Sequence, residues 1–75
     1  MKYENNIDGV FGLKITEQNK ATVSGDTDQP EVTVQLKDDI EATRMIAEFE
    51  DPEGELMQAD DSVFKSYPEL AVFIP

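Results

Sequence analysis

EVTVQLKDDIEATRMIAEFEDPEG, residues 31–54, contains the clearest strand pattern and the clearest helix pattern of the chain. In residues 31–36 the apolar side chains of Val32, Val34 and Leu36 alternate with polar ones, which is typical of a strand with one buried face. Asp38 then stands where an N-cap residue accepts backbone amides, and Glu41 follows three residues later, as in a capping box. The stretch therefore predicts a strand followed directly by a helix.

The expected helix covers residues 39–50. Its apolar stripe has members spaced by three, four and seven residues, whereas Glu41, Arg44 and Glu48 are expected on another side at ion-pair spacing. The stripe consists of Ala42, Met45, Ile46 and Phe49. A β-hairpin is the alternative for residues 43–57, because Met45, Ala47 and Phe49 also alternate and Asp51-Pro52-Glu53-Gly54 suits a β-turn. We favour the helix, since Ala, Glu, Arg and Met are better helix formers than strand formers.

Two further strands are expected before this stretch, at residues 10–16 and 21–24, where apolar and polar side chains alternate. A connecting loop with an odd number of residues keeps the apolar side chains on one face, and we expect it to place Ile15 opposite Val23. Residues 1–8 are mostly polar and are expected to form a loosely held arm, followed by a turn at Asp8-Gly9.

The C-terminal third supplies fewer regular patterns. Asp60-Asp61-Ser62 is expected to cap a brief helical turn that Pro68 ends. The five consecutive apolar residues 70–74 are interpreted as a strand buried in the sheet. The chain, residues 1–75, is thus predicted to be a single small acidic domain of the α+β class: a small antiparallel β-sheet, made of a meander plus the C-terminal strand, with one helix packed on a face. An all-β sandwich is the alternative.

Charge is the most unusual feature of the composition. The chain has 17 acidic and 6 basic residues, and seven of the acids lie between positions 48 and 61, where there is no base. Such a surface repels nucleic acids and anionic membranes and attracts basic partners in a salt-sensitive way. The acidic run, extended by Asp38, Asp39 and Glu41, is therefore the candidate partner-binding site. Its seven residues are Glu48, Glu50, Asp51, Glu53, Glu55, Asp60 and Asp61.

The function expected from this run is protein binding. Carboxylates two residues apart on a strand, or three to four apart on a helix, lie about 5 to 7 Å from each other, so that a rigid acidic face can imitate phosphates. The hypothesis is an acidic protein-binding module that inhibits a nucleic-acid-binding protein by occupying its basic groove. In size and charge alone it resembles phage- or plasmid-encoded inhibitors that mimic DNA. The alternative is a small structural or accessory module that uses residues 70–74 for strand addition or for self-association as a homodimer.

Other functions are disfavoured by what the composition lacks. The chain has neither histidine nor cysteine, so the usual pairs of nucleophile and base are absent, and we expect no enzyme activity. Asp26-Thr27-Asp28 supplies oxygen ligands, but Pro30 and Glu31 break the calcium-loop pattern, and we expect no metal and no cofactor. With no apolar run long enough for a membrane span and no apolar segment near Met1, the expected location is the cytoplasm.

Overall fold

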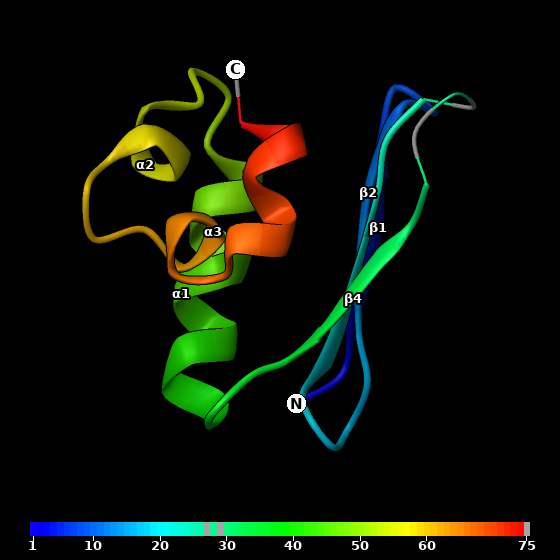
Figure 1. Cartoon of the computed structure of the whole chain (residues 1–75). Helices are drawn as coiled ribbons and strands as arrows, with labels where there is room; N and C mark the ends of the chain where they lie inside the picture. The colour runs from blue at the N-terminus through cyan, green and yellow to red at the C-terminus, as the bar shows by residue number, and fades with distance from the viewer. Residues whose placement is uncertain (27, 29, 75) are drawn as a thin grey trace.

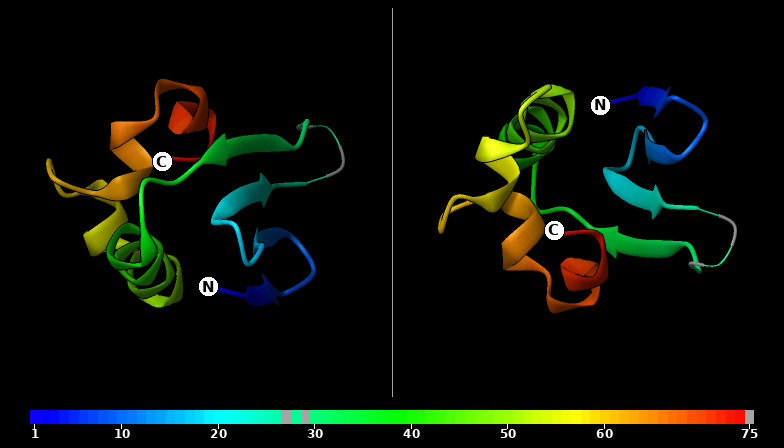
Figure 2. Two further views of the ribbon diagram at one scale, coloured as in Figure 1. Left: turned by 90° about the horizontal axis from the view of Figure 1, so that it is seen from below. Right: turned by 90° about the horizontal axis from the view of Figure 1, so that it is seen from above.

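Two layers make up the computed structural model, which describes residues 1–26, 28 and 30–74. One layer is a four-stranded antiparallel sheet and the other is a group of helices that covers one of its faces (Figures 1 and 2). The elements are β1 (Tyr3–Ile7), β2 (Phe11–Ile15), β3 (Lys20–Ser24), β4 (Val32–Gln35), α1 (Asp39–Glu50), α2 (Glu55–Gln58), α3 (Val63–Ser66) and the 3₁₀ helix η1 (Pro68–Phe73). The α+β prediction is confirmed, and the all-β alternative is wrong.

The sheet is a simple meander in which neighbouring strands follow one another in the order β1-β2-β3-β4. The loop between β2 and β3 has the expected odd length: Asn19, with φ +62°, turns the chain between Thr16 and Lys20. The predicted partner was wrong, however. Ile15 pairs with Ala21, and Val23 pairs with Leu13, so the register differs by two residues and the apolar face stays whole.

Strand β1 is a correction, because residues 1–8 were expected to be a loose arm. Tyr3–Ile7 pairs with β2 along its whole length and forms an edge of the sheet. The turn at Asp8-Gly9 is confirmed: both residues have positive φ, 53° and 70°, as the central residues of a type I′ β-turn require, and the Val10 amide donates to the Ile7 carbonyl (2.9 Å). Most of the side chains of β1 are exposed, so the strand shows no apolar alternation in the sequence.

Helix α1 is confirmed over residues 39–50, which removes the hairpin alternative for that stretch. The side chain of Asp38 accepts a hydrogen bond from the Glu41 amide (2.9 Å), and the Glu41 carboxylate accepts from the Lys37 amide (3.0 Å), a variant of the capping box that reaches one residue further back. Ala42, Met45 and Phe49 are buried and Ile46 is half-buried, so the predicted stripe does face the sheet.

The predicted strand at residues 70–74 is wrong, since Pro68–Phe73 is the 3₁₀ helix η1. Every third side chain turns inward, because a 3₁₀ helix has three residues per turn. Leu70 is fully buried and Tyr67 and Phe73 are half-buried, whereas Val72 is 54% exposed. The apolar run therefore buries every third side chain in a helix. The alternative function, strand addition by residues 70–74, has no strand to use in this structure.

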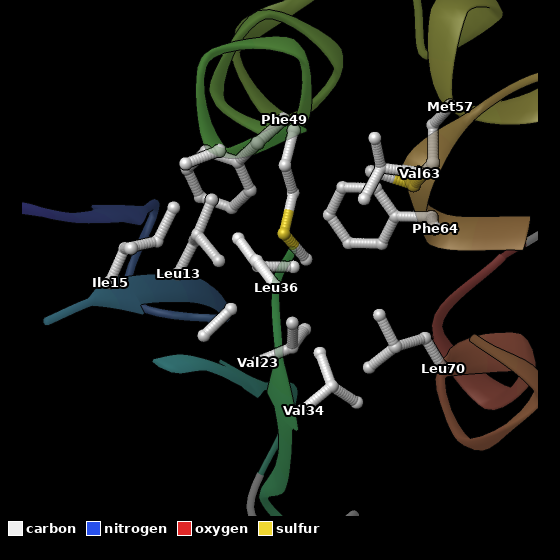
Figure 3. Packing of buried hydrophobic residues seen from close by; sticks show 13 residues of the cluster. Leu13, Ile15, Val23, Val34, Leu36, Phe49, Met57, Val63, Phe64 and Leu70 are labelled. Carbon is white, nitrogen blue, oxygen red and sulfur yellow. The ribbon is translucent and has the colours of Figure 1, made fainter. Parts of the chain in front are cut away.

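The core lies between the two layers (Figure 3). The sheet contributes aliphatic side chains, and the helical layer contributes the two largest, Phe49 and Phe64, which point toward Leu36 from different helices. The labelled residues of this cluster are Leu13, Ile15, Val23, Val34, Leu36, Phe49, Met57, Val63, Phe64 and Leu70. A chain of this length buries only about 60% of its unfolded surface, so each of these side chains matters for stability.

Candidate protein-binding surface

The connection between α1 and α2 carries four carboxylates within six residues. We call this segment the acidic turn; its acids are Glu50, Asp51, Glu53 and Glu55. Asp51-Pro52-Glu53-Gly54 has Asp, Pro and Gly at the positions where a type I β-turn favours them, and the Gly54 amide donates to the Asp51 carbonyl (3.1 Å). Gly54 has φ +70°, a conformation that glycine adopts without strain. The sequence therefore builds a tight turn directly after the helix.

The side chain of Asp51 holds this turn together. Its two carboxylate oxygens accept from the amides of Leu56 (3.0 Å) and Glu53 (3.2 Å). Hydrogen bonds from those amides, the one from Leu56 first, lower the pKa of Asp51 below its usual value. Asp51 therefore stays ionised at any physiological pH, at a position fixed by the backbone.

Glu50 links the acidic turn to the edge of the sheet. Its carboxylate accepts from the Tyr3 hydroxyl (2.8 Å), and the pKa of Tyr3 is raised by burial and then by this bond. Glu53 and Glu55 are exposed. In the described part of the chain, no ion pair joins any of the four carboxylates to a base. The acidic turn thus presents its charge to solvent without neutralisation.

Glu48 is a correction, because it does not face solvent with the rest of the acidic run. The residue is only 6% exposed, and both of its carboxylate oxygens accept from the Val63 amide, at 2.9 and 3.0 Å. Burial raises the pKa of Glu48, and the hydrogen bonds from the backbone at Val63 and Phe64 partly offset that rise. Its role is to tie α1 to the first turn of α3, and it cannot take part in a docking surface.

Asp60 and Asp61 are exposed but lie beside bases, unlike the acidic turn. Lys65 Nζ is 3.9 Å from Asp60 Oδ1, and Arg44 Nη2 is 3.7 Å from Asp61 Oδ2. Arg44 also donates to the Asp61 carbonyl (2.6 Å), while Ser62 caps α3 by accepting from the Lys65 amide (3.1 Å). The helical turn predicted after Ser62 is confirmed. This pair of aspartates is a second, partly neutralised acidic group.

The acids at the start of α1 were expected to extend the surface, and they do not. They lie at the other end of a helix of 12 residues, which at about 1.5 Å per residue is roughly 18 Å long. Asp39 accepts from Asn19 Nδ2 (2.9 Å), which lowers its pKa, and lies 3.5 Å from the Met1 amine. Glu41 accepts from the Tyr67 hydroxyl; burial first, and then this bond, raise the pKa of Tyr67 to about 12. These carboxylates are engaged in the fold.

The described residues contain neither a cluster of metal ligands nor a membrane-spanning helix. Within residues 1–26, 28 and 30–74, no three or more acidic side chains come together in a way that could hold a metal ion. Asp26 accepts from the Asp28 amide (3.4 Å) in an Asx turn; Thr27 lies outside the described residues. None of the described helices has the length and apolar character needed to span a membrane.

Comparisons of the chain with protein-family models, with curated proteins and with solved structures found no match. The candidate site therefore stands on geometry alone. Of the seven acids predicted from the sequence, the structure groups four in the acidic turn, places two beside bases and buries one.

Proposed function

We propose that this protein is an acidic protein-binding module whose acidic turn docks on a basic surface of another protein. The observation that carries the proposal is the acidic turn: Asp51 holds its backbone, and none of its four carboxylates forms an ion pair with a base among the described residues. A cluster of fixed charges attracts an opposite surface over about one Debye length, roughly 8 to 10 Å at physiological salt. Association should therefore be fast at low salt and weaken as salt rises.

The partner class that we propose is a nucleic-acid-binding protein, which the module inhibits by occupying its basic groove. Such grooves carry clustered Lys and Arg side chains that neutralise phosphates, and the carboxylates of one short turn can pair with the same side chains. The net charge of −11 on 75 residues favours this class over acidic or neutral partners. The acidic turn holds only four of the seven acids predicted from the sequence. We therefore propose contact with a few basic residues and not imitation of a long duplex.

The test compares two variants that lose the same charge at different places. The turn variant removes three of the four charges of the acidic turn by combining Glu50→Gln, Glu53→Gln and Glu55→Gln. Asp51 is kept because its side chain holds the turn. The matched control combines Glu4→Gln, Glu17→Gln and Glu31→Gln, three exposed acids outside the turn. Each tagged protein is used to capture binding proteins from a host lysate at low salt, followed by elution along a salt gradient.

The expected result is that the wild type and the control capture the same basic protein, and that the turn variant does not. The captured protein is then titrated with labelled duplex DNA, and addition of the wild-type chain should displace the DNA. Equal capture by both variants would show that net charge alone matters and would remove the acidic turn as the site. Capture without displacement of DNA would keep protein binding and reject inhibition of a nucleic-acid-binding protein.

A further inference from the structure

An apolar pocket opens beside the acidic turn and is lined by residues of β1, β2, α1, the turn after it, α2 and η1. Figure 1 shows the turn after β1, the turn after α1 and the end of η1 at the same end of the molecule. Its volume is about 270 Å³. The apolar part of its lining comes from both layers: Ile7, Phe11, Phe49, Met57 and Phe73. The pocket is thus the place where the core reaches solvent between the sheet and the helices.

Aromatic packing makes the floor of this pocket rigid. The ring of Phe11 lies 4.9 Å from that of Phe49, 6.2 Å from Phe73 and 6.3 Å from Phe64, centroid to centroid. These distances are within the range in which aromatic rings attract each other. Phe11 is held from three sides, although it is only half-buried itself. Such a preformed apolar surface can receive a side chain without rearranging.

Three apolar side chains near this end of the molecule are exposed to solvent, although the chain has few apolar residues for its core. Ile7 is 38% exposed, Val10 is 51% exposed and Val72 is 54% exposed. Ile7 lines the pocket, Val10 follows β1 at the hairpin turn, and Val72 precedes Phe73. An exposed apolar surface with a polar rim is typical of a site for another protein, and Ile7 forms such a surface here with the half-buried Phe11 and Phe73.

The rim indicates the chemistry of the occupant. Asp51 and Glu53, two acids of the acidic turn, line the pocket, and none of its described lining residues is a base. A segment that enters the pocket therefore meets apolar side chains in the centre and carboxylates at the edge. The volume lies below the roughly 300 to 1,000 Å³ typical of small-molecule sites, so a single side chain fits better than a metabolite.

We propose that this pocket receives one apolar side chain of the basic partner, from a segment in which Lys or Arg residues flank that side chain and contact Asp51 and Glu53. The inference rests on the proposed function and adds the recognition element that charge alone cannot supply. Electrostatic attraction brings many basic proteins to the acidic turn, whereas the pocket selects those with an apolar side chain between their basic residues.

The test uses two synthetic peptides of equal charge, one with arginines on both sides of a central leucine and one with serine in place of that leucine. Burial of a leucine side chain predicts at least about tenfold tighter binding of the leucine peptide, measured by fluorescence anisotropy at fixed salt. The preference should disappear in Ile7→Asn, which changes an exposed position of the pocket. It should persist in Leu56→Asn, a matched change at a residue that is 51% exposed and does not line the pocket.

Each outcome decides the inference. A leucine preference that Ile7→Asn removes and Leu56→Asn keeps supports it. Equal binding of both peptides, lost in the variant with a neutralised acidic turn, overturns the pocket and leaves the proposed function intact. A preference that depends on Leu56 assigns the site to another apolar patch and also overturns the pocket. If neither peptide binds, the pocket is rejected, and the lysate capture described above still judges the acidic turn separately.

Discussion

Two regions of this molecule carry carboxylates only a few residues apart and use them in opposite ways. At the junction of α1 and α3, Glu48 is buried and both of its oxygens are bound to one backbone amide. At the acidic turn, Glu53 and Glu55 are exposed and have no base beside them in the described structure. A run of acids in a sequence is therefore not one functional unit, since burial divides it into charges that support the fold and charges that are free to bind.

The largest expected difference between the two regions is in the free energy of unfolding. Glu48→Ala leaves the buried amide of Val63 without an acceptor and should lower the free energy of unfolding by about 2 kcal/mol. Glu53→Ala removes an exposed carboxylate and should change it by less than about 0.5 kcal/mol. Urea unfolding followed by circular dichroism measures both.

Glu48→Gln is the matched control for that prediction. The amide oxygen keeps one acceptor for Val63 and carries no charge to desolvate, so this variant should be clearly more stable than Glu48→Ala. If Glu48→Ala unfolds at the same urea concentration as the wild type, the carboxylate does not hold α1 to α3.

A smaller loss of stability is expected within the acidic turn itself. Asp51→Ala removes the acceptor of the Leu56 and Glu53 amides, but these amides are near the surface and water can replace the carboxylate. The variant should unfold at a urea concentration between those of Glu48→Ala and the wild type. The amides of residues 53–56 should exchange their hydrogens faster than in the wild type, whereas those of the sheet should not. Unchanged exchange at residues 53–56 would contradict the role given to Asp51.

The two regions should also respond to pH with opposite signs. The pKa of Glu48 is raised in the folded state, so its contribution makes the protein less stable as pH rises from about 4.5 through the folded pKa. The pKa of Asp51 is lowered, so its contribution is present above about 3.8 and is lost as pH falls through the folded pKa. The free energy of unfolding of the wild type is compared with that of Glu48→Gln from pH 7 down to 4.5, and with that of Asp51→Asn below pH 4. The two comparisons separate the contribution of Glu48 from that of Asp51. Parallel stability curves for either pair would contradict the corresponding assignment.

The smallest effect is expected at the partly neutralised pair of aspartates, Asp60 and Asp61. Asp61→Asn removes one exposed ion pair with Arg44, which should change the free energy of unfolding by no more than about 0.5 kcal/mol. The same variant should keep the salt-dependent capture of basic partners, because Asp61 is outside the acidic turn. Loss of capture in Asp61→Asn would extend the docking surface to residues 60–61 and weaken the distinction between the acidic groups.

Much of the fold could be predicted from the sequence, because local patterns and tertiary packing agree there. Strands β2, β3 and β4 show alternation, and α1 has both a cap and an apolar stripe. Strand β1 was missed because pairing at the edge of a sheet needs only backbone groups, so Asn5 and Asn6 carry no signal. The helix η1 was missed because five apolar residues in a row suit a buried strand as well as any other structure.

The candidate site was partly predictable. The β-turn at Asp51-Pro52-Glu53-Gly54 was predicted as part of the hairpin alternative, and the structure forms it after the helix instead. The position of Glu48 on the helix left a weak signal: at 100° per residue it lies about 60° beyond Met45, at the border of the apolar stripe, where a second element can cover it. What the sequence could not reveal is that the Val63 amide, 15 residues later, lies within reach of its carboxylate. That contact depends on how α3 packs.

The three-residue repeat of η1 places an unusual restriction on the length of the chain. Tyr67, Leu70 and Phe73 face inward because they are three apart, and the residues between them are exposed. Exchange of an outer residue such as Glu69 or Val72 leaves this arrangement intact. Deletion or insertion of one residue inside the segment would shift the frame and turn a different set of side chains toward the core. In this part of the protein, evolution is freer to change the amino acids than to change their number.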